Sequence, residues 1–100
     1  MPNSNYIKGR SFEYQVKKDF EADGYLVMRA SGSHGIFDLA CFCQAGSTYL
    51  IQCKVTNDKK TINNLKKEFC KVKPFDQSVY TQALAIKVTG TKEYTLYIPE

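Results

Sequence analysis

The sequence predicts an α/β fold of the α+β mixed-sheet kind, in which helices flank a sheet of mixed strand direction. Segments with helical apolar spacing interrupt strand-like runs, and the order reads helix, three strands, helix, two strands (αβββαββ). Each helix needs an apolar sheet surface to cover, which the neighbouring strands supply. The 100 residues contain no repeat or low-complexity tract, so we expect a single domain over residues 1–100.

Residues 9–23 are predicted to form an amphipathic helix. Ser11 can serve as its N-terminal cap, and Gly24 is placed to end it. The apolar residues at helical spacing are Phe12, Val16 and Phe20. The preceding residues 1–8 are polar, and we expect them to be loose.

Three strands are predicted next. Residues 25–30 are apolar and aromatic, and the turn-prone residues 31–35 follow them. Residues 36–43 and 48–56 form a hairpin across a turn that contains Gly46. Both strands of the hairpin are apolar enough to be central in the sheet.

The last part of the chain is predicted to form a helix and two strands. A polar loop at 57–60 precedes the helix, which Pro74 ends. The apolar residues of this helix are Ile62, Leu65, Phe69 and Val72. Residues 79–88 and 93–98 are strand-like, and the turn-like residues 89–91 join them.

The charge balance is modestly basic. Fourteen Lys and Arg against ten Asp and Glu give a net charge of +4, which fits a polyanionic partner and fits a role in solubility equally well. No apolar stretch approaches membrane-spanning length and no signal peptide is evident. We expect a soluble, intracellular protein, in the cytoplasm or, for a viral chain, in the host cytoplasm.

The four cysteines lack the paired C-x-x-C spacing of a zinc site. We expect reduced, mostly buried thiols. A three-sulfur metal site is the alternative, because Cys41 and Cys43 can share one side of a strand near Cys53.

The hairpin carries a polar cluster within apolar strands. If the turn centres near Ala45, Asp38 lies opposite Gln52. Because strand side chains alternate, Gln52 and Lys54 share a face, while Cys53 points the other way. A charged residue in an apolar strand needs a partner, so the cluster is either a functional site or a buried ion pair between Asp38 and Lys54.

Glu13 is predicted on the side of the first helix that faces the sheet, because it is spaced by three and seven residues from Val16 and Phe20. From there its carboxylate could join the polar cluster of the hairpin. The alternative is a boundary Glu that pairs with Lys17, its neighbour one turn along the helix.

This ordered set of residues resembles the PD-(D/E)xK nuclease superfamily, in which a helix Glu, a strand Asp and an acid-x-Lys on the next strand form the site. It is most similar to the archaeal-type Holliday-junction resolvases, over about the first 56 residues and by element order beyond them. The site residues that the resemblance implies are Glu13, Asp38, Gln52 and Lys54. The other matching segments are residues 8–10, 24–25, 27–33 and 49–56.

The chain departs from the family pattern at two positions. Phe37 stands where the superfamily name has Pro, a position that supplies no metal ligand. Gln52 stands where the resolvases usually have Glu, although some related restriction-type nucleases also have Gln-x-Lys. Loss of one carboxylate is expected to weaken metal binding, because two unit charges about 4 Å apart interact by about 4 kcal/mol at an effective dielectric of about 20.

The resemblance implies a Mg²⁺-dependent endodeoxyribonuclease that acts on branched or duplex DNA as a homodimer. Glu13, Asp38 and the Gln52 carbonyl oxygen are the expected Mg²⁺ ligands, with Mn²⁺ expected to substitute. Lys54 is expected to orient the attacking water or to stabilise developing negative charge. The expected DNA-binding residues are Arg10, Arg29, Ser33, Lys59, Lys60, Lys66 and Lys67.

Several alternatives remain open at this point. The chain could be a restriction-type duplex DNA endonuclease, or a DNA-binding relic whose catalysis Gln52 has weakened. The lysines around the second helix could form a solvated face. Phe69 is expected to be a core or dimer contact rather than a base-stacking residue. The only histidine, His34, is expected in an exposed loop.

Overall fold

The computed structural model describes residues 4–29, 37–72 and 81–98, and it confirms the predicted order of helices and strands. Within these residues the secondary structure elements are α1 Ser4–Ala22, β1 Leu26–Arg29, β2 Leu39–Phe42, β3 Thr48–Thr56, α2 Thr61–Val72, β4 Thr81–Val88 and β5 Thr95–Tyr97. No helix of this part of the chain is long and apolar enough to cross a membrane.

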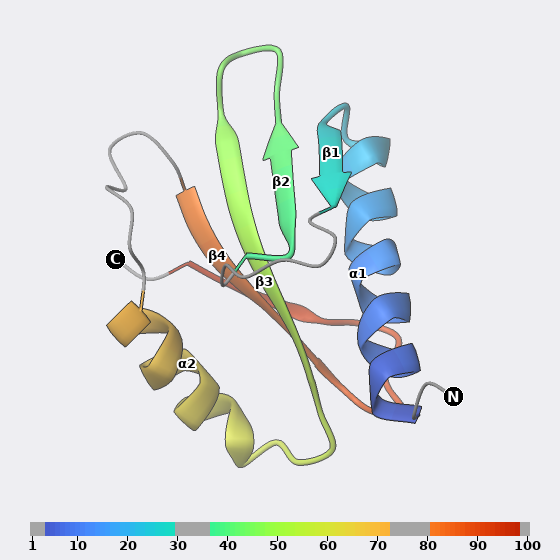
Figure 1. The fold of residues 1–100 in the computed structure, drawn as a ribbon, viewed down its shortest axis with the longest axis vertical. Helices are drawn as coiled ribbons and strands as arrows, with labels where there is room; N and C mark the ends of the chain where they lie inside the picture. Colours follow the sequence, from blue (N-terminus) through green and yellow to red (C-terminus); the bar gives the residue numbers. More distant parts are fainter. Residues whose placement is uncertain (1–3, 30–36, 73–80, 99–100) are drawn as a thin grey trace.

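The five strands form one mixed sheet in the order β1-β2-β3-β4-β5. The pairs β1–β2, β2–β3 and β4–β5 are antiparallel, whereas β3 and β4 are parallel. A parallel pair needs a crossover, and α2 lies in the connection between these two strands (Figure 1). The predicted mixed sheet is therefore confirmed, with β3 at its centre.

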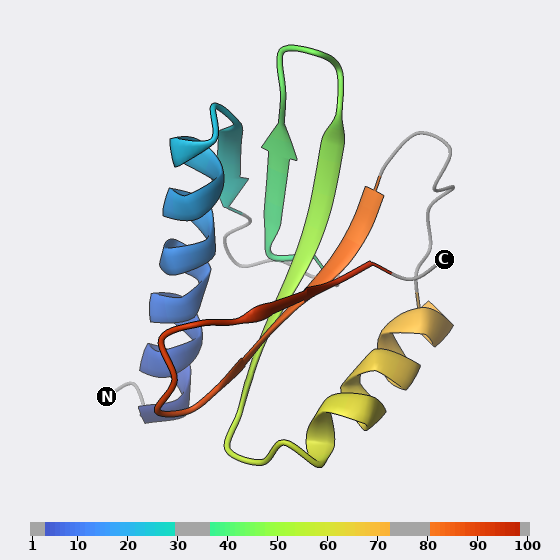
Figure 2. The same cartoon turned by 180° about the vertical axis from the view of Figure 1, so that it is seen from behind.

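The two helices cover opposite faces of the sheet. Along β4, Ala83 and Ala85 face the core beside α1, and the alternating Leu84 and Ile86 pack with Phe69 of α2. Figures 1 and 2 show α1 beside β1 to β3 and α2 at the other side of the sheet. The remaining buried residues of the α1 core are Phe12, Val16, Val27, Leu39, Cys41 and Ile51.

Helix α1 begins earlier than predicted. The expectation that residues 1–8 are loose is wrong from Ser4 onward, and Ser11 lies inside the helix instead of capping it. Gly9 costs an isolated helix about 1 kcal/mol relative to Ala. That cost is small beside the packing of Phe12 and Val16, so the helix continues through Gly9.

The predicted end of α1 is confirmed. Gly24 has φ +93°, its N–H donates to the Glu21 carbonyl at 3.0 Å, and the Tyr25 N–H donates to the Phe20 carbonyl at 3.0 Å. These two bonds form a Schellman motif, in which a left-handed glycine satisfies the last carbonyl groups of a helix.

Strands β2 and β5 are shorter than predicted. β2 begins at Leu39 where residue 36 was predicted, and residue 36 itself lies outside the described residues. β3 has the predicted bounds. β5 covers three of the six predicted residues, which is typical of a short edge strand.

Candidate active site

Asp38 lies one residue before β2, beside the middle of β3. The β2–β3 register is the predicted one, with Leu39 opposite Ile51, but the matched ladder ends there, one step before Asp38 and Gln52. Instead, the Asp38 N–H donates to the Ile51 carbonyl at 2.8 Å, and its Oδ2 accepts the Cys53 N–H at 2.8 Å. The carboxylate thus binds the backbone beside Gln52, and this bond replaces a regular ladder step.

Gln52 and Lys54 share one face of β3, as the alternation predicted. They line a cavity of about 110 Å³ together with Leu65, Glu68 and Phe69 of α2. Cys53 lies on the other face, against the α1 core. Lys54 is exposed and makes no ion pair within the described residues, so the alternative of a buried Asp38–Lys54 pair is wrong.

Glu13 points from α1 to the end of β1. Its Oε1 accepts a hydrogen bond from Arg29 Nε at 2.9 Å, and the two side chains are 17% and 23% exposed. The alternative pairing with Lys17 is wrong, because Lys17 binds Glu21 at 2.9 Å. Arg29 is brought to Glu13 by the packing of β1 against α1, which local helix spacing does not reveal.

Glu13 and Asp38 are close enough to repel each other. Burial raises the pKa of Glu13, and the charge of Asp38 raises it further, while Arg29 and Arg10 oppose both effects. Two carboxylates that repel each other favour a bound cation, and carboxylate and amide oxygens are the ligands that Mg²⁺ prefers.

The four predicted site residues therefore fall into two pairs, Glu13 with Asp38 and Gln52 with Lys54. Asp38 joins the two pairs only through the backbone of β3, where it binds the residue between Gln52 and Lys54. The side chains of Gln52 and Lys54 lie on the α2 side of the sheet, whereas Glu13 comes from α1. Within the described part of the chain, no three His, Cys, Asp or Glu side chains gather as a metal site would require. Glu13 and Asp38 supply oxygen ligands of the kind that Mg²⁺ prefers, whereas the alternative three-sulfur site is wrong.

The predicted DNA-binding residues occupy two regions. Arg10 and Arg29 lie near the ring of Tyr14, with Cζ 5.9 and 5.4 Å from its centroid. Tyr14 was not predicted, although its i, i+4 spacing from Arg10 was a usable signal. Ser33 and His34 lie outside the described residues.

The second region surrounds α2. Lys66 lies over the Tyr97 ring, with Nζ 4.9 Å from the centroid, and lines a surface cavity of about 460 Å³ with Lys67 and Lys71. Lys59 and Lys60 are exposed just before the helix. Phe69 is 1% exposed, which confirms the expectation that it is a core residue.

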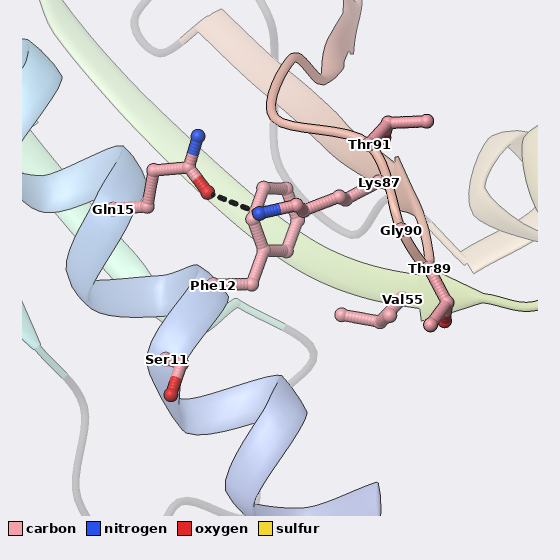
Figure 3. A pocket seen from close by; sticks show the side chains of 8 residues that line it. All are labelled: Ser11, Phe12, Gln15, Val55, Lys87, Thr89, Gly90 and Thr91. Atoms are coloured by element: carbon pink, nitrogen blue, oxygen red, sulfur yellow. Dashed lines mark hydrogen bonds between the residues drawn. The ribbon is translucent and has the colours of Figure 1, made fainter.

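Another cavity, of about 340 Å³, lies between α1 and the β4–β5 turn (Figure 3). Lys87 Nζ donates to Gln15 Oε1 at 2.7 Å and lies 5.9 Å from the Phe12 ring centroid, while Gln15 Nε2 donates to the Lys92 carbonyl at 2.8 Å. None of the four predicted site residues lines it. These bonds join α1 to β4 and to the turn, which gives Lys87 a structural role.

The cysteines are free and mostly buried or half-buried. Cys41 is buried, Cys43 and Cys53 are half-buried, and Cys70 is exposed, with its Sγ 3.4 Å from the Tyr97 hydroxyl. The prediction of mostly buried thiols holds for the first three and is wrong for Cys70, which is exposed in the surface cavity that it lines with Tyr97.

Two comparisons agree with this arrangement. The family model described as "Archaeal holliday junction resolvase (hjc)" matches residues 4–100. The crossover junction endodeoxyribonuclease Hjc of Methanocaldococcus jannaschii is 33% identical over 86 residues, which are 85% of this chain and 62% of that protein. The chain thus spans less than two-thirds of that relative. The match along nearly the whole chain, together with the five-stranded mixed sheet and its two helices, shows that this protein belongs to the archaeal Holliday junction resolvase family.

Proposed function

We propose that this protein is a Mg²⁺-dependent endodeoxyribonuclease that resolves four-way DNA junctions by hydrolysing phosphodiester bonds. The observation that carries the proposal is the placement of Asp38 against the backbone of β3, close enough to Glu13 to raise its pKa. The family of the chain and the name of its relative, a crossover junction endodeoxyribonuclease, support the same activity. An enzyme that acts on DNA junctions would work inside the cell.

Asp38, Glu13 and Gln52 would hold the metal ion through oxygen atoms. The chemistry supplied by a bound Mg²⁺ is polarisation of the phosphodiester and activation of a water. The Cys53 N–H fixes one carboxylate oxygen of Asp38, so the other can point to a ligand without loss of side-chain order. Lys54 would orient the attacking water or stabilise negative charge that develops on the phosphate.

Cleavage of defined DNA substrates tests the proposal. The purified protein is incubated with a four-way junction, a nicked duplex and a linear duplex, each with Mg²⁺ or Mn²⁺. We expect the junction to be cut with either metal, and Asp38→Ala and Lys54→Ala to abolish cutting while much of the DNA binding remains. Preference for the linear duplex would favour a restriction-type enzyme. Failure to cut any of the substrates would overturn the proposed nuclease function.

Gln52 favours one competing function, a DNA-binding relic. An amide at this position leaves the site with one negative charge fewer than the family pattern. Glu68 lines the cavity with Gln52 and Lys54, but within the described residues it forms no three-acid group with Glu13 and Asp38. Gln52→Glu separates the two functions. A relic would gain cutting only in this variant, whereas an active enzyme cuts without it and binds Mg²⁺ more tightly with it.

We also propose that the protein works as a homodimer. A four-way junction presents paired strands, and a two-fold dimer would place two equivalent sites on it. Light scattering of the purified protein tests this directly, with twice the 11.4 kDa chain mass expected for the dimer. The chain mass at all concentrations up to those used for cleavage would overturn it.

A further inference from the structure

Tyr14 lies on α1 between two arginines and next to Glu13. The ring is 40% exposed, with the Arg10 guanidinium carbon 5.9 Å and the Arg29 guanidinium carbon 5.4 Å from its centroid. Arg10 precedes it by one helical turn, whereas Arg29 comes from the end of β1. The ring is therefore the feature that the two arginines share.

Two guanidinium groups near one side chain repel each other unless something offsets their charge. The face of an aromatic ring carries partial negative charge and attracts a cation within about 6 Å of its centroid. A hydrogen bond from Arg10 also lowers the pKa of the Tyr14 hydroxyl. Tyr14 thus attracts both arginines through its ring and holds Arg10 a second time through its hydroxyl.

Arg29 has a second anchor, which fixes one edge of its guanidinium group. Its Nε donates to Glu13 Oε1 at 2.9 Å. A guanidinium has five N–H donors, so the Nε bond leaves the donors of the two terminal nitrogens for another acceptor. Such planar, forked donors match the oxygens of a phosphate.

We propose that Tyr14 is a positioning residue that holds Arg10 and Arg29 as a two-guanidinium clamp for a DNA phosphate beside Glu13. The ligand class rests on the proposed function, whereas the clamp itself rests on the contacts of Tyr14. Without the ring, both side chains keep their charge but lose their common support. They must then be ordered when the phosphate binds, which weakens binding.

A double-mutant cycle on DNA affinity tests the clamp. Dissociation constants for a fluorescent four-way junction are measured by anisotropy in EDTA, which prevents metal-dependent cutting. We expect Tyr14→Leu to raise Kd about fivefold, equivalent to about 1 kcal/mol, which is the scale of a cation–π contact. Tyr14→Phe keeps the ring and should raise Kd by less than about twofold.

The arginine variants provide the control for this cycle. In an Arg10→Gln, Arg29→Gln background, Tyr14→Leu has no clamp to disturb and should leave Kd unchanged. If the double variant does not fold, as judged by circular dichroism, Arg10→Gln alone serves as the background, since Arg10 is exposed, and the effect of Tyr14→Leu should then be reduced by about half. An equal effect of Tyr14→Leu in the wild-type and arginine-variant backgrounds would overturn the clamp.

The same samples separate this inference from the proposed function. Junction binding with the expected coupling but no cutting in Mg²⁺ supports the clamp and overturns the nuclease. Cutting by the wild-type protein with no coupling between Tyr14 and the arginines overturns the clamp alone. If the wild-type protein binds no DNA, both are overturned.

Discussion

The Asp38 side chain combines a structural bond with its proposed chemical role. Its Oδ2 accepts the Cys53 N–H at 2.8 Å, while its charge raises the pKa of Glu13. The hydrogen bond from Cys53 needs only an acceptor oxygen, whereas the effect on Glu13 needs a negative charge. Asn keeps the oxygen and loses the charge, so it separates the two effects, whereas Ala removes both.

We expect Asp38→Asn to keep the fold and to lose metal binding. The Asn carbonyl oxygen can still accept the Cys53 N–H, so the free energy of unfolding should change by less than about 1 kcal/mol, which is the net worth of one hydrogen bond. Asp38→Ala leaves that N–H without its partner and should cost about 1–3 kcal/mol. Urea unfolding measures both, and Mn²⁺ titration should show weak binding in both variants. Equal destabilisation by Asn and Ala would contradict the hydrogen bond.

The cysteines should differ in their reaction with thiol reagents. Burial raises the pKa of Cys41 from 9.0 to about 11, so at pH 8 this thiol is protonated as well as shielded, whereas Cys70 is exposed. We expect iodoacetamide to modify Cys70 first, and Cys41 only after unfolding. Peptide mass mapping over time measures this order, with Cys70→Ser as the control. Equally fast modification of Cys41 in folded protein would contradict its burial.

The same raised pKa gives a pH dependence of stability with a definite sign. A folded-state pKa above the unfolded value means that the folded protein binds the proton more tightly. The stabilisation by the neutral Cys41 is therefore complete below pH 9 and is lost as the pH rises toward 11. The free energy of unfolding should fall between pH 9 and pH 11 as Cys41 ionises, and Cys41→Ala should make this fall smaller.

At the scale of single residues, the sequence predicts which side chains share a face within one element. It does not predict contacts between side chains of different elements. The shared face of Gln52 and Lys54 follows from strand alternation and was predicted. The bond from Arg29 to Glu13 joins residues 16 apart, so its formation depends on how β1 packs on α1. Local spacing favoured Lys17 for that reason. The contact of Tyr14 with Arg29 also joins two elements, whereas its spacing from Arg10 within α1 was a local signal.

At the scale of elements, the sequence predicts order and type better than bounds. The αβββαββ order, the hairpin and the end of α1 were predicted, because apolar periodicity and a turn glycine act locally. The first residues of α1 and β2 were not predicted correctly. Gly9 looked like a boundary although packing further along carries the helix through it, and the Asp38 carboxylate takes the N–H that would have extended the ladder.

The glycine inside α1 and the glycine that follows its end should respond to alanine in opposite directions. Gly24 has φ +93°, which an L side chain adopts at a cost, so Gly24→Ala should destabilise the protein by about 1 kcal/mol. Gly9 lies inside the helix and a Cβ there meets nothing within 4 Å, so Gly9→Ala should stabilise by about 0.5–1 kcal/mol. Thermal and urea unfolding of the two variants measure this contrast. Destabilisation by Gly9→Ala would show that the helix does not extend through Gly9.

At the scale of the whole molecule, the proposed DNA contacts lie on two separate parts of the fold. The Arg10 and Arg29 pair belongs to α1 and β1, whereas the lysines lie on α2 and the loop before it. The helices cover opposite faces of the sheet, and β3 lies centrally between them (Figure 2). A junction bound at Asp38 and Lys54 would need an arm toward each region for both to contribute.

Salt dependence of junction binding can count these contacts. Each neutralised phosphate adds about 0.9 to the slope of log affinity against log salt concentration. Arg10→Gln with Arg29→Gln, and Lys60→Gln with Lys67→Gln, should each lower the slope by up to about 1.8, and all four changes together by up to about 3.6. The control pair, Lys18→Gln with Lys92→Gln, removes the same charge at exposed positions outside the predicted set.

The pattern of slopes distinguishes contact with DNA from a general effect of net charge, which is +4 in the wild-type protein. If net charge alone attracts DNA, all three pairs should lower the slope equally, because each removes two charges. If DNA contacts only one region, one pair changes the slope and the other behaves like the control. The third outcome is that both pairs lower the slope additively while the control pair leaves it unchanged. One DNA molecule must then reach α1 with β1 and α2 with its preceding loop at the same time. A branched substrate can do this with two arms, so a linear duplex too short to span both regions should show only one of the two changes.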